Sequence, residues 1–148
     1  MQAPSTTATS RRNTQTEAKG AEFLVLGTLM ALGIPSYIAH ANTPDFDIVA
    51  TNPLSGKFAR VQVKSRWESD AVSFPISSLN SDFVVVVLLL RGTTKYSTLQ
   101  FAPVFYVLPT SVVASAPRLG AMGKTMISKI PSFMATRDDW RAISRFLK

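Results

Sequence analysis

Acidic, amide and basic side chains stand close together in one stretch of the sequence, PDFDIVATNPLSGKFARVQVKSRW, residues 44–67. Asp45 and Asp47 precede a short apolar segment, and Gln62 and Lys64 lie two positions apart among valines. Side chains two apart in a strand project to the same face. If the two segments pair as an antiparallel hairpin, an acid, an amide and an ammonium group converge on one face.

Carboxylate and amide oxygens beside a lysine suit the metal-assisted hydrolysis of a phosphodiester bond. The oxygens hold a divalent cation, which polarises the phosphate and lowers the pKa of a bound water. The lysine positions the attacking water and offsets the negative charge that develops on the phosphate. The alternative is an exposed hairpin face on which Gln62 and Lys64 are ordinary polar residues.

The available residue types restrict the kind of metal site. The chain has no cysteine and a single histidine, His40. This composition excludes thiolate sites and His-cluster zinc sites. Any bound metal must therefore have oxygen ligands, which favours Mg²⁺, Mn²⁺ or Ca²⁺.

The charge balance favours a polyanionic partner. A formal net charge of +7 and a pI near 10.2 fit nucleic acid first and an anionic membrane surface second. The bland alternative is that the excess charge only aids solubility. The longest apolar run, residues 83–90, is shorter than the roughly 20 residues of a membrane span, and no secretory signal is recognisable. We expect a cytoplasmic protein without a membrane segment.

A helix is predicted over residues 17–32, between the cap-forming Thr16 and the stop signal Gly33. Its apolar residues cover most of the circumference, which predicts a largely buried helix. Glu22 is unusual because it shares a face with apolar neighbours such as Val25. Either Glu22 lies in the exposed first turn, where the helix dipole favours acids, or a partner group offsets its charge.

The hairpin supplies the next elements. Strands are predicted over residues 46–51 and 58–66, and Arg60 and Arg66 share the face of Gln62 and Lys64. Residues 34–41 form a short strand or a loop. The other predicted elements are an interior strand in residues 82–92, a strand over 99–109, a short helix over 110–116, a short edge strand over 124–130 and a C-terminal helix over 136–148 capped by Thr136.

Together these elements predict an α/β fold with a mixed central β-sheet flanked by helices. The length of 148 residues fits one domain. We place that domain at residues 16–148, after a flexible basic tail at residues 1–15.

The residues of the hairpin carry a family resemblance. DFDIVA, a turn and VQVKSR resemble the active-site hairpin of the PD-(D/E)XK, or restriction-endonuclease-like, nuclease superfamily. KGAEFLVLGTLMALG resembles the first helix of that family, and SDFVVVVLL and FYVLPTSVV resemble later strands of its resolvase-like and homing-endonuclease-like members. The resemblance covers residues 17–113 and implies an α-β-β-β-α-β core.

The resemblance implies specific roles. Glu22, Asp47, Gln62 and Lys64 are the implied catalytic residues, and Glu22, Asp47 and Gln62 are the implied ligands of Mg²⁺ or Mn²⁺. Asp45 is the second choice for the position of Asp47. Gln62 replaces the usual carboxylate, which removes one negative charge and leaves a weaker ligand.

The implied activity is metal-dependent endonucleolytic cleavage of DNA. Lys57, Arg60 and Arg66 are candidate contacts to DNA phosphates. A domain of this size covers few base pairs, so a homo-oligomer, a dimer or a tetramer, is expected. The alternatives are a nuclease-fold module that binds nucleic acid without cutting it, which Gln62 permits, and a structural subunit of a nucleoprotein assembly.

Overall fold

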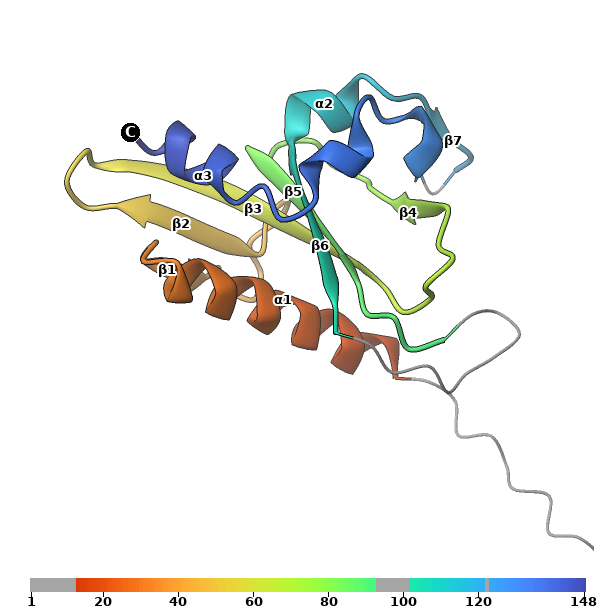
Figure 1. Cartoon of the computed structure of the whole chain (residues 1–148), viewed down its shortest axis with the longest axis horizontal. Helices are drawn as coiled ribbons and strands as arrows, with labels where there is room; N and C mark the ends of the chain where they lie inside the picture. Colours follow the sequence, from red (N-terminus) through yellow and green to blue (C-terminus); the bar gives the residue numbers. More distant parts are fainter. Residues whose placement is uncertain (1–12, 93–101, 122) are drawn as a thin grey trace, which may run out of the picture.

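The computed structural model describes residues 13–92, 102–121 and 123–148 (Figure 1). In chain order, the elements are α1 (Thr14–Ala31), β1 (Ser36–Ile38), β2 (Ile48–Asn52), β3 (Lys57–Arg66), β4 (Ser73–Pro75), β5 (Phe83–Leu88), β6 (Val104–Pro109), α2 (Thr110–Ala114), β7 (Arg118–Leu119), β8 (Lys124–Met126), the 3₁₀ turns η1 (Ile127–Lys129) and η2 (Phe133–Thr136), and α3 (Arg141–Phe146).

The central sheet of the described residues has the strand order β1-β2-β3-β5-β6. β2 pairs antiparallel with both β1 and β3, β3 pairs in parallel with β5, and β5 pairs antiparallel with β6. The sheet is therefore mixed, and the predicted α/β fold is confirmed. The connection from β3 to β5 contains β4 and not the helix that an α-β-β-β-α-β core places there. The predicted hairpin is also confirmed, with Ile48 opposite Val61 and Asn52 opposite Lys57.

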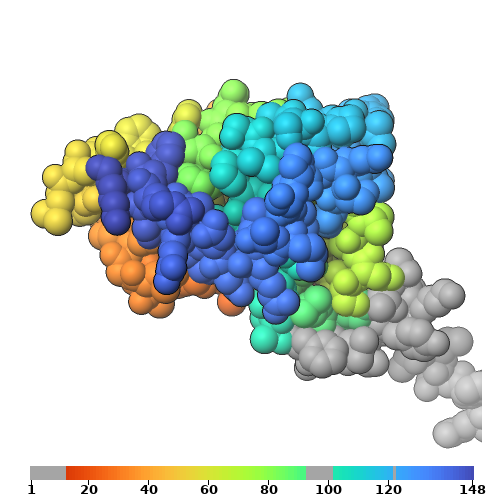
Figure 2. All heavy atoms as spheres, turned by 45° about the horizontal axis from the view of Figure 1, so that its top comes forward, coloured from red at the N-terminus to blue at the C-terminus, as the bar shows by residue number. Residues whose placement is uncertain are grey.

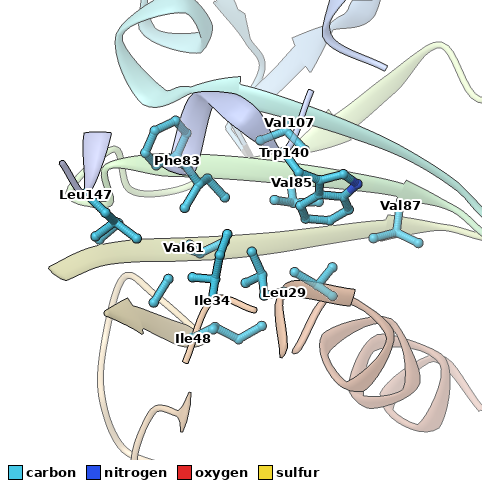
Figure 3. Packing of buried hydrophobic residues seen from close by; sticks show 14 of the residues in the cluster. Leu29, Ile34, Ile48, Val61, Phe83, Val85, Val87, Val107, Trp140 and Leu147 are labelled. Atoms are coloured by element: carbon cyan, nitrogen blue, oxygen red, sulfur yellow. The ribbon is translucent and has the colours of Figure 1, made fainter. Parts of the chain in front are cut away.

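β5 is the interior strand that its apolar sequence predicts, because every residue of Phe83–Leu88 is buried. Val85 and Val87 face a core that α1 and α3 cover, and Figure 3 shows Leu29, Val61 and Trp140 in the same cluster. Val84 and Val86 face a second core on the other side of the sheet. That second core is closed by side chains of β4, α2 and the segment around η1 and η2.

A smaller sheet of order β4-β8-β7 contributes to the second core. The predicted strand in residues 124–130 is present as β8, but it ends at Met126 and its predicted edge position was wrong, because β8 lies between β4 and β7. β4 and β7 are two to three residues long. Both are strands because they pair with β8. Segments this short carry no strand pattern of their own in the sequence.

α1 starts earlier and is less buried than predicted. Asn13 caps it, since its side-chain oxygen accepts the backbone N–H of Thr16 at 3.0 Å. Ala21, Val25 and Leu29 are buried, whereas Phe23 and Met30 are each 56% exposed. A helix that lies on a sheet buries one stripe of residues, so apolar residues on its outer side face solvent.

The predicted tail at residues 1–15 lies mostly outside the described residues. Its last positions, Thr14 and Gln15, already belong to α1. The part of the predicted 99–109 strand that precedes residue 102 is also outside them, and β6 is observed at Val104–Pro109. Among the helices of the described ranges, none is long and apolar enough to cross a membrane.

The C-terminal helix is shorter than the predicted 136–148 segment. Arg137 forms a bridge with Tyr106, and the Asp138 N–H donates to the carbonyl of Phe105 at 2.9 Å. These contacts hold the chain against β6, so Thr136 does not cap a helix, and α3 begins at Arg141. Asp138 and Asp139 therefore precede α3.

α3 ends against the tip of the β2–β3 hairpin, and Figure 2 shows this C-terminal segment across one face of the molecule. The Leu147 carbonyl accepts hydrogen bonds from Asn52 Nδ2 at 3.0 Å and Ser55 Oγ at 2.7 Å. The hairpin that carries the candidate site is thus tied to the end of the chain.

Candidate active site

Asp47 lies immediately before β2, at the edge of β3. Its backbone N–H donates to the Val61 carbonyl at 2.9 Å, and its Oδ2 accepts the N–H of Val63 at 2.7 Å. β3 continues past the first residue of β2, and the Asp47 carboxylate satisfies a backbone donor of that extension. The two bonds fix the carboxylate beside the segment that carries Gln62 and Lys64.

Gln62 is buried beside Val84 of β5, with 6% of its surface exposed. Its Oε1 is buried and has no hydrogen-bond partner among the described residues. An unsatisfied buried acceptor costs roughly 1–3 kcal/mol. Such a group is expected to gain an external partner, either a hydrogen-bond donor or a cation.

Lys64 lies two residues further along β3, beside Val86. Its side chain is half-buried, and this burial lowers the pKa of the ammonium group below its ordinary 10.5. The Asp47 carboxylate acts in the opposite direction and raises that pKa. The acid and the lysine are therefore electrostatically coupled, with Gln62 between Lys64 and the start of β3.

Glu22 lies well beyond the first turn of α1, because the helix begins at Thr14. The interpretation of Glu22 as an exposed first-turn acid was therefore wrong. Its Oε2 forms an ion pair with Lys19 Nζ at 2.6 Å, and its side chain is 15% exposed. Glu22 is the partly buried, paired acid of the second interpretation.

α1 packs on the face of the sheet opposite to Gln62 and Lys64, and its link to the site is through the charge of Asp47. Val61 belongs to the core under α1, whereas Gln62 and Lys64 alternate to the opposite face. Glu22 raises the pKa of Lys19 through a hydrogen bond and its charge, and Asp47 adds a smaller increase. Asp47 thus lies within electrostatic reach of both the Lys19–Glu22 pair and Lys64.

Asp45 has a different environment from Asp47. Its Oδ2 accepts a hydrogen bond from Asn80 Nδ2 at 3.1 Å. Hydrogen bonds from Ser78 and Asn80 lower its pKa, with a further contribution from the charge of Arg60. Asp45 is held by the loop before β5, so the geometry favours Asp47 as the acid nearest Gln62 and Lys64.

The three candidate DNA contacts differ in their pairing. The guanidinium of Arg60 binds Asp82 through Nε at 3.1 Å and Nη2 at 3.2 Å. Arg66 Nη2 lies 3.4 Å from Glu68. Lys57 is exposed at the start of β3. Arg60 and Arg66 are therefore partly neutralised within the protein, and their role toward phosphate stays a prediction.

Lys19 was not anticipated from the sequence. The signal was present, since a lysine three residues before a glutamate on a helix lies on the same face. It gave no indication that Asp47 would come close, because that approach depends on how α1 packs on the sheet.

The donor set fits a hard divalent cation with few protein ligands. Across the described part of the chain, no group of three or more His, Cys, Asp and Glu residues could hold a metal ion. The candidate set has two carboxylates and one amide oxygen, from Glu22, Asp47 and Gln62. Mg²⁺ is commonly bound through one or two carboxylates together with water and substrate phosphate.

Comparison with known proteins finds a likeness of fold to a solved structure. No protein-family model matches the sequence, and no curated protein matches it. The solved structure of the bacterial homing endonuclease I-Ssp6803I is similar, with a TM-score of 0.63 and 18% identity, over 90% of this chain and 93% of that chain. This likeness supports a nuclease-like α/β fold. The PD-(D/E)XK assignment and the roles of the four site residues stay predictions.

Proposed function

We propose that this protein is an endonuclease that hydrolyses phosphodiester bonds in DNA with Mg²⁺ or Mn²⁺. The observation that carries the proposal is the buried, unpaired Oε1 of Gln62 on the strand that also bears Lys64 and binds Asp47. An apolar side chain would fill this position at lower cost. An oxygen in this place is explained by a ligand that it binds.

Asp47, Gln62 and Glu22 are the residues that would hold the cation. A divalent cation bound there supplies polarisation of the phosphate and a lower pKa for its coordinated water. The N–H of Val63 fixes the orientation of the Asp47 carboxylate. Burial lowers the pKa of Lys64 below its ordinary 10.5, the direction that suits a group that exchanges a proton with the attacking water.

DNA is the proposed substrate for two reasons. The similar structure is that of a homing endonuclease, and the net charge of +7 favours a polyanion. A single domain of this size contacts few base pairs, so we propose that a homo-oligomer, a dimer or a tetramer, is the active form.

A plasmid-nicking assay with Mg²⁺ and with Mn²⁺ tests the proposal. Asp47→Ala should abolish cleavage, and Lys64→Ala should lower the rate by about 10²-fold or more. Lys129→Ala, at an exposed lysine of η1, is the matched control and should cut like the parent protein. Equal cleavage by all variants would show that the site is assigned wrongly.

Gln62 is uncharged and a weaker cation ligand than a carboxylate. This favours a second candidate, a nuclease-fold module that binds DNA without cutting it. Gln62→Glu separates the two because it restores the carboxylate with little change in shape. In the active enzyme this variant should retain cleavage and hold the cation at least as tightly. DNA binding by the parent protein without cleavage under either metal would support the binding module.

A further inference from the structure

Glu22, a proposed ligand of the cation, forms an ion pair with Lys19 in this structure. Lys19 Nζ lies 2.6 Å from Glu22 Oε2. The lysine side chain is 57% exposed and the glutamate side chain 15% exposed. The carboxylate is therefore largely shielded from solvent, while the ammonium approaches it from the solvent side on a long, mostly exposed side chain.

The charge of Asp47, the second proposed anionic ligand, also acts on the Lys19 ammonium and raises its pKa. Glu22 and Asp47 supply the negative charge of the proposed metal site, and Lys19 is a positive charge near both. A cation that binds these carboxylates must overcome the repulsion of Lys19 and break its bond to Glu22.

We propose that Lys19 occupies the cation-binding oxygen of Glu22 in the metal-free protein and competes with the divalent cation for it. Lys19 is then a positioning residue that weakens metal binding until the ammonium is displaced. The inference rests on the proposed function, because it requires Glu22 and Asp47 to bind a cation. An ordinary surface ion pair would stabilise the helix by a few tenths of a kcal/mol and would leave metal affinity unchanged.

Mn²⁺ titration of the full chain without DNA, followed by the electron paramagnetic resonance of free Mn²⁺, tests this inference without relying on cleavage. Lys19→Met should bind Mn²⁺ about three- to tenfold more tightly than the parent protein at low salt. The difference should shrink as the salt concentration rises. Lys19→Arg keeps the charge and the ion pair, so its affinity should equal that of the parent.

Two further variants make the outcome specific. Lys129→Met removes an exposed lysine on η1 and should leave Mn²⁺ affinity unchanged, which excludes an effect of net charge. Asp47→Asn removes a proposed ligand and should weaken Mn²⁺ binding. Thermal unfolding by circular dichroism verifies that each variant is folded.

The failures of the two proposals are distinguishable. If Asp47→Asn weakens Mn²⁺ binding but Lys19→Met binds no more tightly than the parent, the inference about Lys19 is overturned and the proposed metal site stands. If the parent protein binds no Mn²⁺, or if Asp47→Asn binds it equally well, both proposals are overturned.

Discussion

The side chain of Gln62 links the sequence pattern to the proposed chemistry. Alternation along a strand placed Gln62 and Lys64 on one face, and the hairpin register brings Asp47 next to them. These relations are local, so the sequence was sufficient to predict them. The environment of Glu22 was not predictable, because the approach of α1 to the edge of β3 depends on packing over the whole core.

Gln62→Leu should separate stability from metal binding. In the metal-free protein it removes an unsatisfied buried oxygen beside Val84, and stability should stay equal or rise by about 1 kcal/mol. Mn²⁺ affinity should fall, since a ligand is lost. Urea unfolding and Mn²⁺ titration measure the two effects.

Gln62→Glu is the complementary variant. It places a carboxylate in the same buried position, so it should destabilise the metal-free protein and be stabilised more strongly than the parent by added Mn²⁺. A large loss of stability in Gln62→Leu would contradict the interpretation of Oε1 as an unpaired group.

Lys64→Met should be more stable than the parent protein at neutral pH, by a few degrees in Tm. Burial lowers the pKa of Lys64 below 10.5 in the folded state, so the charged lysine opposes folding at neutral pH. As the pH rises from the lowered pKa toward 10.5, the unfolded chain holds more protons than the folded one, and the parent gains stability. The advantage of Lys64→Met should therefore shrink with rising pH. Thermal unfolding at a series of pH values measures it, and a pH-independent difference would refute it.

Among the elements, β5 and the ends of α1 and α3 show what local pattern can and cannot predict. The apolar run of β5 was sufficient to predict an interior strand, because a continuous run of β-branched residues suits a strand that is covered on both faces. The shortened α3 depends on the pairing of Arg137 with Tyr106, which joins residues far apart in sequence. β4, β7 and β8 are likewise defined by pairing with one another.

Asp82 connects β3 to the loop before β5, and its removal should destabilise the protein. Its Oδ2 accepts the backbone N–H of Arg60 at 2.7 Å, and its carboxylate also binds the Arg60 side chain. Asp82→Asn should cost roughly 1–3 kcal/mol, since charged hydrogen bonds of a partly buried group are lost. The control Asp139→Asn removes a solvent-exposed ion pair in which Asp139 Oδ2 lies 3.7 Å from Arg145 Nη2. Its loss should cost about 0–1 kcal/mol.

The pH dependence of the Asp82 contribution has a defined sign. Burial alone raises the pKa of Asp82, but hydrogen bonds and the charge of Arg60 outweigh it, and the pKa lies below 3.8. The stabilisation is therefore complete above 3.8 and is lost as the pH falls through the lowered pKa. Urea unfolding of the parent and Asp82→Asn should converge in strong acid. A constant difference would show that Asp82 acts through packing alone.

For the molecule as a whole, fold and charge are better determined than substrate. An identity of 18% to a solved homing endonuclease accompanies a TM-score of 0.63, because a pattern of buried positions specifies a fold with few fixed residues. The net charge of +7 is a property of composition and needs no structure. The DNA sequence or shape that the proposed endonuclease would prefer depends on side chains at an interface, which neither pattern nor composition defines.

DNA binding should weaken steeply as the salt concentration rises. The chain has 16 Lys and Arg residues. Each phosphate that they neutralise releases counterions and adds about −0.9 to the slope of log affinity against log salt concentration. Lys57→Ala removes an exposed cation of the hairpin, so it should lower the affinity for all sequences and reduce the slope by about one contact. Fluorescence anisotropy with duplex DNA, in the presence of Ca²⁺ to limit cleavage, measures both quantities.

Because Arg60 is already partly neutralised by Asp82, Arg60→Ala should change the slope less than Lys57→Ala. The reverse order would mean that DNA displaces Asp82 from Arg60, and a salt-independent affinity would contradict the proposed interaction with DNA.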